Sequence, residues 1–181
     1  MLLTPGAGSN RDHATLVAIE EGMAPTPVLR IDFPYRIAGR KAPDRAPVLV
    51  DAIRHGLEQV TVANAIPPER VVMGGRSMGG RMCSMLAAEA DVTVAGLILI
   101  SYPLHPPGKP ERLRVEHFAA MDLPVLFISG TRDPFGTPEE FEREVVAIPG
   151  PVEVVWIDGG RHDLKGADDR IVGTVAAWLS R

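Results

Sequence analysis

A serine flanked by glycines follows an apolar run and precedes a segment of helical period. The motif is Gly75-x-Ser77-x-Gly79, and the apolar run before it is Val71–Met73. A serine hydroxyl becomes an effective nucleophile when a tight turn after a strand lifts it above the sheet edge, and its neighbours must be small because strand and helix approach closely there. The spacing therefore predicts that Ser77 is a nucleophile. The alternative is a glycine-rich turn in which Ser77 only caps a helix.

A nucleophilic serine needs a histidine to take its proton and a carboxylate to orient that histidine. Asp133 and His162 follow Ser77 in that order, and each stands in a glycine-containing segment just after a later apolar run. We therefore predict that Ser77, Asp133 and His162 act together in acyl transfer. Asp158 and Asp163 are alternatives for the carboxylate, and Asp133 could instead form an Asx turn or cap a helix.

The other histidines fit the role of base less well than His162, whose own alternative is a place in a surface loop. His13 and His55 lie in predicted helices, and His117 lies in a charged segment without a motif. His105 follows an apolar run and could line a pocket, but it precedes the candidate acid in the chain.

Two backbone N–H groups are candidates to hold the negative charge that develops on a carbonyl oxygen under attack. Met78 supplies the first because it directly follows the serine. Ala7 supplies the second because Gly6-Ala7-Gly8 comes soon after the apolar run Leu2–Thr4 and lets the backbone approach a substrate. The same glycines could open a dinucleotide-binding loop, but Arg11 stands where that motif needs its third glycine.

Substrate contacts are expected from residues that follow predicted strands: Gly6, Tyr102 and Phe135. No histidine or carboxylate pair shows metal-ligand spacing and no phosphate-binding Gly-Lys-Ser/Thr sequence occurs, so we predict neither a metal nor a cofactor. The only cysteine, Cys83, excludes an internal disulfide and is expected to be a small buried residue.

The residues that could do chemistry follow short aliphatic runs that alternate with helical segments. This alternation is typical of α/β proteins in which helices cover both faces of a parallel sheet, and ligands of such sheets bind at the carboxyl ends of the strands. We predict a three-layer αβα sandwich with a mostly parallel six-stranded sheet. The predicted strands are Leu2–Thr4, Val28–Ile31, Val71–Met73, Val94–Ile100, Val125–Ser129 and Val152–Ile157. The predicted helices are His13–Glu21, Pro47–Ala63, Met78–Ala90, Pro138–Val146 and Asp168–Leu179.

Length and composition indicate one domain over residues 1–181, with 45% hydrophobic and 23% charged residues. The net charge of −4 provides no cationic field, so we predict neither nucleic acid nor a membrane surface as a partner. The longest apolar run, Val94–Ile100, is too short to cross a bilayer. The first ten residues lack the pattern of a signal peptide, and the single cysteine fits a reducing cytoplasm, where we expect the protein.

Taken together, the motifs resemble those of the α/β-hydrolase superfamily, and the resemblance covers nearly the whole chain. It implies a catalytic triad of Ser77, Asp133 and His162 and an esterase-like activity. The motifs that carry it are Gly75-Arg76-Ser77-Met78-Gly79, Gly130-Thr131-Arg132-Asp133 and Gly160-Arg161-His162. Further motifs resemble the small branch related to testis-expressed protein thirty, which is akin to dienelactone hydrolases: Pro5–Gly8, Gly74–Arg81, Ser101–Gly108 and Asp133–Gly136.

The chain departs from the superfamily pattern in two places. It begins at what resembles the third strand of the fuller sheet, so an exposed strand edge is expected, and we expect a homodimer to cover it. Pro5 stands where many members have histidine. This difference could alter the oxyanion loop but leaves the Ala7 N–H available. The segment Leu104–Phe118, 15 residues long, is too short for a lid domain, so the fold is expected to be minimal and the site open.

Two functions follow from these residues. The first is a serine hydrolase that cleaves small or medium carboxylic esters or thioesters, with a small-molecule ester as substrate. The second is a scaffold or binding protein that retains the hydrolase fold without turnover. An intact set of Ser77, Asp133 and His162 favours the first, because a scaffold has no physical need for all three groups.

Overall fold

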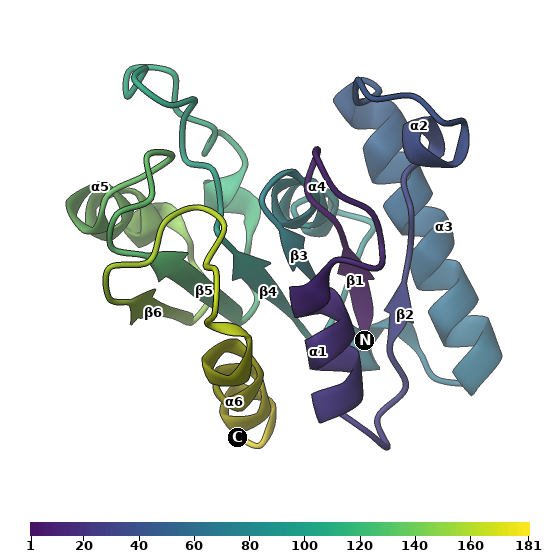
Figure 1. Ribbon diagram of the computed structural model, residues 1–181. Helices are drawn as coiled ribbons and strands as arrows, with labels where there is room; N and C mark the ends of the chain where they lie inside the picture. Colours follow the sequence, from purple (N-terminus) through teal and green to yellow (C-terminus); the bar gives the residue numbers. More distant parts are fainter.

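Six parallel strands form one sheet in the order β2-β1-β3-β4-β5-β6 in the computed structural model, which describes residues 1–181 (Figure 1). The predicted sheet is thereby confirmed, and every neighbouring pair of strands in it runs parallel. The strands are β1 (Leu2–Thr4), β2 (Leu29–Arg30), β3 (Val72–Arg76), β4 (Gly96–Ile100), β5 (Val125–Gly130) and β6 (Val152–Ile157).

Helices cover both faces of this sheet. Helices α1 (Ala14–Gly22) and α6 (Asp168–Leu179) lie side by side on the face that is toward the viewer in Figure 1. The other face packs against α3 (Ala46–Asn64), α4 (Met78–Ala87) and α5 (Pro138–Glu144). Three short 3₁₀ segments complete the regular structure: Pro68–Arg70, Phe118–Ala120 and Val145–Ala147.

The alternation of side chains along the central strands divides the core into two halves. In β4, Leu97 and Leu99 join the cluster beneath α3 and α4, whereas Ile98 and Ile100 join the cluster beneath α1 and α6. All four side chains are fully buried, as a parallel strand covered on both faces requires. The central strands are therefore fixed from both sides, and so are the loops that leave their carboxyl ends.

Several element boundaries differ from the predicted ones. Strand β3 continues past Met73 to Arg76, because Gly74, Gly75 and Arg76 pair in register with β4. Apolar runs mark only the part of a strand with large side chains, so glycines at its end escape prediction. Helix α4 ends at Ala87, three residues earlier than predicted.

One short helix was not predicted. Helix α2 (Pro34–Ile37) follows β2, in a segment that lies between the predicted elements. Its signal is a proline at the first helical position, which is favoured there because proline fixes φ and the missing N–H would lack a partner in any case. The side chain of Tyr35 in this helix is buried and reaches back toward the β1 loop.

No helix in the structure combines the length and the apolar character that a membrane span requires. The loops after β1, β3, β5 and β6 all leave the carboxyl-end edge of the sheet, and they carry the predicted site residues.

Candidate active site

Ser77 occupies the single position between the end of β3 and the start of α4. Its backbone has φ 52° and ψ −117°, a conformation that L residues rarely adopt and that occurs where the surrounding structure enforces it. The N–H of Ser77 donates to the carbonyl of Ile100 at 2.8 Å, which anchors the turn to β4. The Ser77 side chain makes no capping hydrogen bond to α4, so its hydroxyl is free for another partner.

Two glycines allow this turn to form. A Cβ placed on Gly79 would lie 2.5 Å from the carbonyl oxygen of Pro5, and one on Gly75 would lie 2.7 Å from the carbonyl oxygen of Thr4. Backbone atoms cannot move aside as a flexible side chain can. The small residues of the motif are therefore required by the close approach of β1 to the turn, as the sequence analysis expects.

The hydroxyl of Ser77 lies 2.8 Å from His162 Nε2, and His162 Nδ1 lies 2.8 Å from Asp133 Oδ2. His162 comes from the loop between β6 and α6, and Asp133 from the loop after β5. Their side chains are 22% and 2% exposed, so the carboxylate is shielded from water while the imidazole reaches the surface. The structure thus brings together the three residues predicted to act together.

Asp133 uses both of its carboxylate oxygens. While Oδ2 faces His162, Oδ1 accepts a hydrogen bond from the N–H of Phe135 at 2.9 Å. This is the Asx turn that the sequence analysis treats as an alternative role, and the two roles coexist. The other acidic candidates lie elsewhere: Asp158 faces Thr131 and Asp163 faces the N–H of Lys165.

Phe135 stacks on the imidazole of His162. The ring centroids are 4.0 Å apart and the planes are inclined by 28°. The sequence analysis expects Phe135 to contact substrate, and in the structure its first contact is with the histidine. The stacked ring restricts the rotation of the imidazole.

The two predicted oxyanion donors lie at the start of α4 and in the loop after β1. Met78 is the first residue of α4, so its N–H has no partner within the helix. Ala7 lies in the loop after β1, and its N–H makes no backbone hydrogen bond, while its carbonyl accepts a hydrogen bond from the Tyr35 hydroxyl at 2.9 Å. Gly6 lies close to the nucleophile, because a Cβ on it would be 3.6 Å from the Cβ of Ser77.

The prediction that Tyr102 contacts substrate is not supported by its position. Tyr102 is 1% exposed, its ring packs against Phe118 and Phe127, and its hydroxyl donates to the carbonyl of Arg114 at 2.7 Å. The sequence places Tyr102 directly after β4, but its side chain turns into the core. Its role is to support the loop that follows β4.

Two further histidines have partners that the sequence did not reveal. His105 is held between the carbonyl of Pro106 and the carboxylate of Glu140, at 2.9 and 3.1 Å. His117 Nε2 lies 2.7 Å from Ser84 Oγ, and burial, followed by the charge of Arg81, lowers the pKa of His117 to about 4. Neither histidine makes a hydrogen bond to Ser77.

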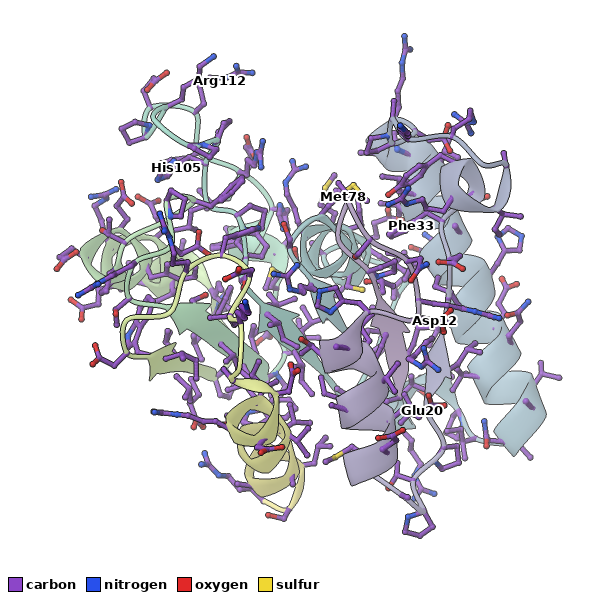
Figure 2. All side chains as sticks on the ribbon, in the orientation of Figure 1. Asp12, Glu20, Phe33, Met78, His105 and Arg112 are labelled. Atoms are coloured by element: carbon purple, nitrogen blue, oxygen red, sulfur yellow. The ribbon has the colours of Figure 1, made fainter.

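Figure 2 shows Met78 at the upper end of the molecule, between Phe33 on one side and the loop that carries His105 and Arg112 on the other. The best-formed cavities lie elsewhere. The largest, about 600 Å³, borders β2 and α3 and is lined in part by Arg30, Ile37 and His55. Ser77 and His162 line none of the five best-formed cavities.

No group of three or more histidine, cysteine, aspartate or glutamate side chains is placed to hold a metal ion. A hydroxyl in contact with an imidazole, whose other nitrogen faces a buried carboxylate, can attack an electrophilic carbon and pass its proton to the imidazole.

Comparison with known proteins identifies the family and the fold. The model of the alpha/beta hydrolase domain family matches residues 1–173. A dienelactone hydrolase from Anabaena variabilis is 20% identical with a TM-score of 0.79, and the alignment covers 99% of this chain and 84% of that one. Est1E from Butyrivibrio proteoclasticus is 15% identical with a TM-score of 0.78, covering 98% and 85%. A monoacylglycerol lipase from Paleococcus ferrophilus is 14% identical with a TM-score of 0.76, covering 98% and 92%. At these identities the structural likeness concerns the fold.

Proposed function

Because the chain belongs to the alpha/beta hydrolase domain family, we propose that it is a serine hydrolase that cleaves small or medium carboxylic esters or thioesters. The observation that carries this proposal is the continuous chain of contacts from Ser77 through His162 to Asp133, with both distances at 2.8 Å. The names of the structural neighbours, which include a dienelactone hydrolase and a lipase, support the choice of ester-type bonds.

In the proposed acylation step, Ser77 Oγ attacks the carbonyl carbon of the substrate and His162 Nε2 takes the hydroxyl proton. Asp133 keeps the proton of His162 on Nδ1 and stabilises the imidazolium that forms. When the tetrahedral intermediate collapses, the bond to the alcohol or thiol breaks and His162 returns the proton to that leaving group. The acyl group is then bound to Ser77 as an ester.

The N–H groups of Met78 and Ala7 hold the oxyanion in this proposal. Each such donor contributes about 3 kcal/mol to the stabilisation of the transition state in related chemistry. A water molecule, with its proton taken by His162, attacks the acyl carbon in the second step. The carboxylic acid leaves and the Ser77 hydroxyl is restored.

The proposed substrates are small or medium because the segment Leu104–Phe118 is too short to add a lid domain over Ser77. It contains no helix or strand apart from Phe118, the first residue of the 3₁₀ segment Phe118–Ala120, and Ser77 lines none of the five best-formed cavities. Two further expectations, a homodimer and a cytoplasmic location, stay predictions. Light scattering coupled to size-exclusion chromatography tests the first, and fractionation of the source cells tests the second.

Hydrolysis of p-nitrophenyl acetate tests the proposed function. We expect turnover by the purified chain and loss of turnover in Ser77→Ala, with an unchanged circular dichroism spectrum. Ser9→Ala is the matched control, since Ser9 lies in the neighbouring β1 loop and its hydroxyl donates only to the carbonyl of Gly6. Turnover that persists in Ser77→Ala would contradict the proposal, and so would a folded wild-type chain without activity on short esters and thioesters.

A further inference from the structure

We propose that Arg76 is a positioning residue for this reaction, which holds the backbone of His162 so that its imidazole stays aligned with Ser77. This inference rests on the proposed function. Arg76 directly precedes the nucleophile. Close packing of the turn requires glycine at positions 75 and 79, but it does not require arginine at position 76.

The guanidinium of Arg76 is buried beneath the loop that carries His162. Arg76 is the last residue of β3 and is 9% exposed. Its Nη2 donates to the backbone carbonyl oxygen of His162 at 2.7 Å. This is the only hydrogen bond that the Arg76 guanidinium makes with another protein group, and the Nε atom is buried without a partner.

The charge of Arg76 is not used in a direct ion pair. The carboxylates of Asp163, Asp133 and Asp168 are near enough to favour its charged form, but none lies within 4 Å of its nitrogens. Burial is the larger effect and lowers the pKa of Arg76, which is still charged because arginine deprotonates only far above neutral pH. Burial lowers the pKa of His13, which precedes α1, and the charge of Arg76 lowers it further. A buried charge with a single carbonyl partner is expensive, which suggests that the contact serves more than stability.

The loop around His162 needs an external anchor. Between β6 and α6 the chain passes through three residues with positive φ, at Gly159, Leu164 and Gly166. Before His162 the loop is tied down by the N–H of Arg132, which donates to the carbonyl of Gly160 at 2.8 Å. At His162 itself, the hydrogen bond from Arg76 links the loop to the end of β3. The base is therefore attached to the residue directly before the nucleophile.

Arg76→Met removes the donor and keeps most of the side-chain volume. We expect kcat on p-nitrophenyl acetate and the rate of labelling by a fluorophosphonate to fall about 100-fold, the cost of a misplacement of about 1 Å, with little change in KM. Arg76→Lys restores a donor and should recover part of both rates. The downfield proton resonance of His162 Nδ1–H should broaden in Arg76→Met, because a loosened loop exposes it to exchange.

Arg30→Met is the matched control. Arg30 is a half-buried arginine on β2, 18% exposed in its side chain, and it pairs with Glu20 and Asp12 away from Ser77. A merely structural role for Arg76 predicts that both variants lose thermal stability and that neither loses labelling rate once folded. Labelling of folded Arg76→Met at the wild-type rate would overturn the inference and leave the proposed function intact.

Failure of the wild-type chain to label at all would overturn the proposed function and this inference with it. If Arg76→Met does not fold, Arg76→Gln takes its place, because its amide is too short to reach the His162 carbonyl. A labelling rate for Arg76→Gln at least about tenfold below the wild type supports the role of Arg76, and an equal rate refutes it.

Discussion

Asp133 makes two hydrogen bonds that serve different purposes. Its Oδ1 accepts from the N–H of Phe135 and shapes the loop after β5, whereas its Oδ2 faces His162 Nδ1. Because the carboxylate is 2% exposed, both contacts are shielded from water. A substitution that keeps the hydrogen bond to Phe135 and changes the contact with His162 can therefore distinguish an effect on loop structure from an effect on activity.

Asp133→Asn is that substitution. The asparagine Oδ1 still accepts from Phe135, but its amide group would face His162 Nδ1 and force the proton onto Nε2, the wrong tautomer for a base. We expect kcat to fall about 10⁴-fold with little loss of stability. The rate of p-nitrophenyl acetate hydrolysis measures the effect on kcat, and urea unfolding measures the effect on stability. Asp158→Asn is the control with activity near wild type, and an active Asp133→Asn would assign the acid role to another group.

His117 makes stability depend on pH. Its pKa of about 4 in the folded chain lies below the value of about 6.5 in the unfolded chain, so the unfolded state binds more protons as pH falls through this window. Stability is therefore lost between pH 6.5 and pH 4. Because His117 is partly exposed, we discount the full shift for screening and expect about 1 to 2 kcal/mol.

Urea unfolding of the wild type and His117→Gln at pH 7 and pH 4.5 measures this difference. The variant should lose less stability on acidification than the wild type. His55→Gln, at an exposed position on α3, should keep the wild-type dependence. Equal pH dependence in the wild type and His117→Gln would show that His117 is not the group responsible.

The residues of the candidate site differ in how far the sequence predicts them. Ser77, Asp133 and His162 are recognisable because each is a residue type that can take part in catalysis and each follows an aliphatic run that predicts a strand. The direction of a side chain is not encoded in this way, which is why Tyr102 was expected to contact substrate although its side chain lies in the core. Arg76 carries no motif role, and only the structure shows that its guanidinium reaches the carbonyl of His162.

At the scale of elements, the turn between β3 and α4 depends on the close approach of β1. Thr4 and Pro5 lie against the glycines of the turn, and the Thr4 hydroxyl donates to the carbonyl of Gly74 at 3.1 Å. The predicted order of strands and helices is confirmed because aliphatic runs and helical periods are strong local signals. Short elements such as α2 and the glycine end of β3 depend on tertiary contacts, so local patterns did not reveal them.

Gly79→Ala tests the packing of this turn. The added methyl would lie 2.5 Å from the Pro5 carbonyl oxygen and from Thr4 Oγ1, so we expect a loss of about 3 kcal/mol in unfolding free energy. Gly173→Ala in α6 is the control, because a Cβ there meets nothing within 4 Å. It should gain about 0.5 to 1 kcal/mol, since alanine favours the helix. Equal effects of the two substitutions on urea unfolding would contradict the packing described here.

At the scale of the whole molecule, the sheet has a short edge strand, and we predict an open site. Strand β2 is two residues long, and Arg30 within it forms ion pairs with Asp12 and Glu20, which are features that protect an edge from unwanted pairing. The largest cavity borders this edge rather than Ser77. Because Ser77 lines none of the five best-formed cavities, we expect acyl chains bound there to gain little burial as they lengthen.

A series of p-nitrophenyl esters with two to eight acyl carbons measures how much burial at Ser77 contributes to kcat/KM as the acyl chain lengthens. Burial of one CH₂ group contributes about 0.8 kcal/mol, roughly a fourfold gain in kcat/KM for each added carbon. We expect a flat or falling series, because a shallow site removes little of the chain from water. A fourfold rise per carbon up to eight carbons would reveal a deep acyl pocket and contradict the open site.

Covalent labelling of Ser77 tests the central claim most directly. After incubation with a fluorophosphonate, digestion and mass spectrometry, we expect one adduct on the peptide that contains Ser77 and a strongly reduced rate in His162→Ala. Absence of an adduct on folded wild-type protein, or an adduct on another serine such as Ser84, would contradict the assignment of Ser77 as nucleophile.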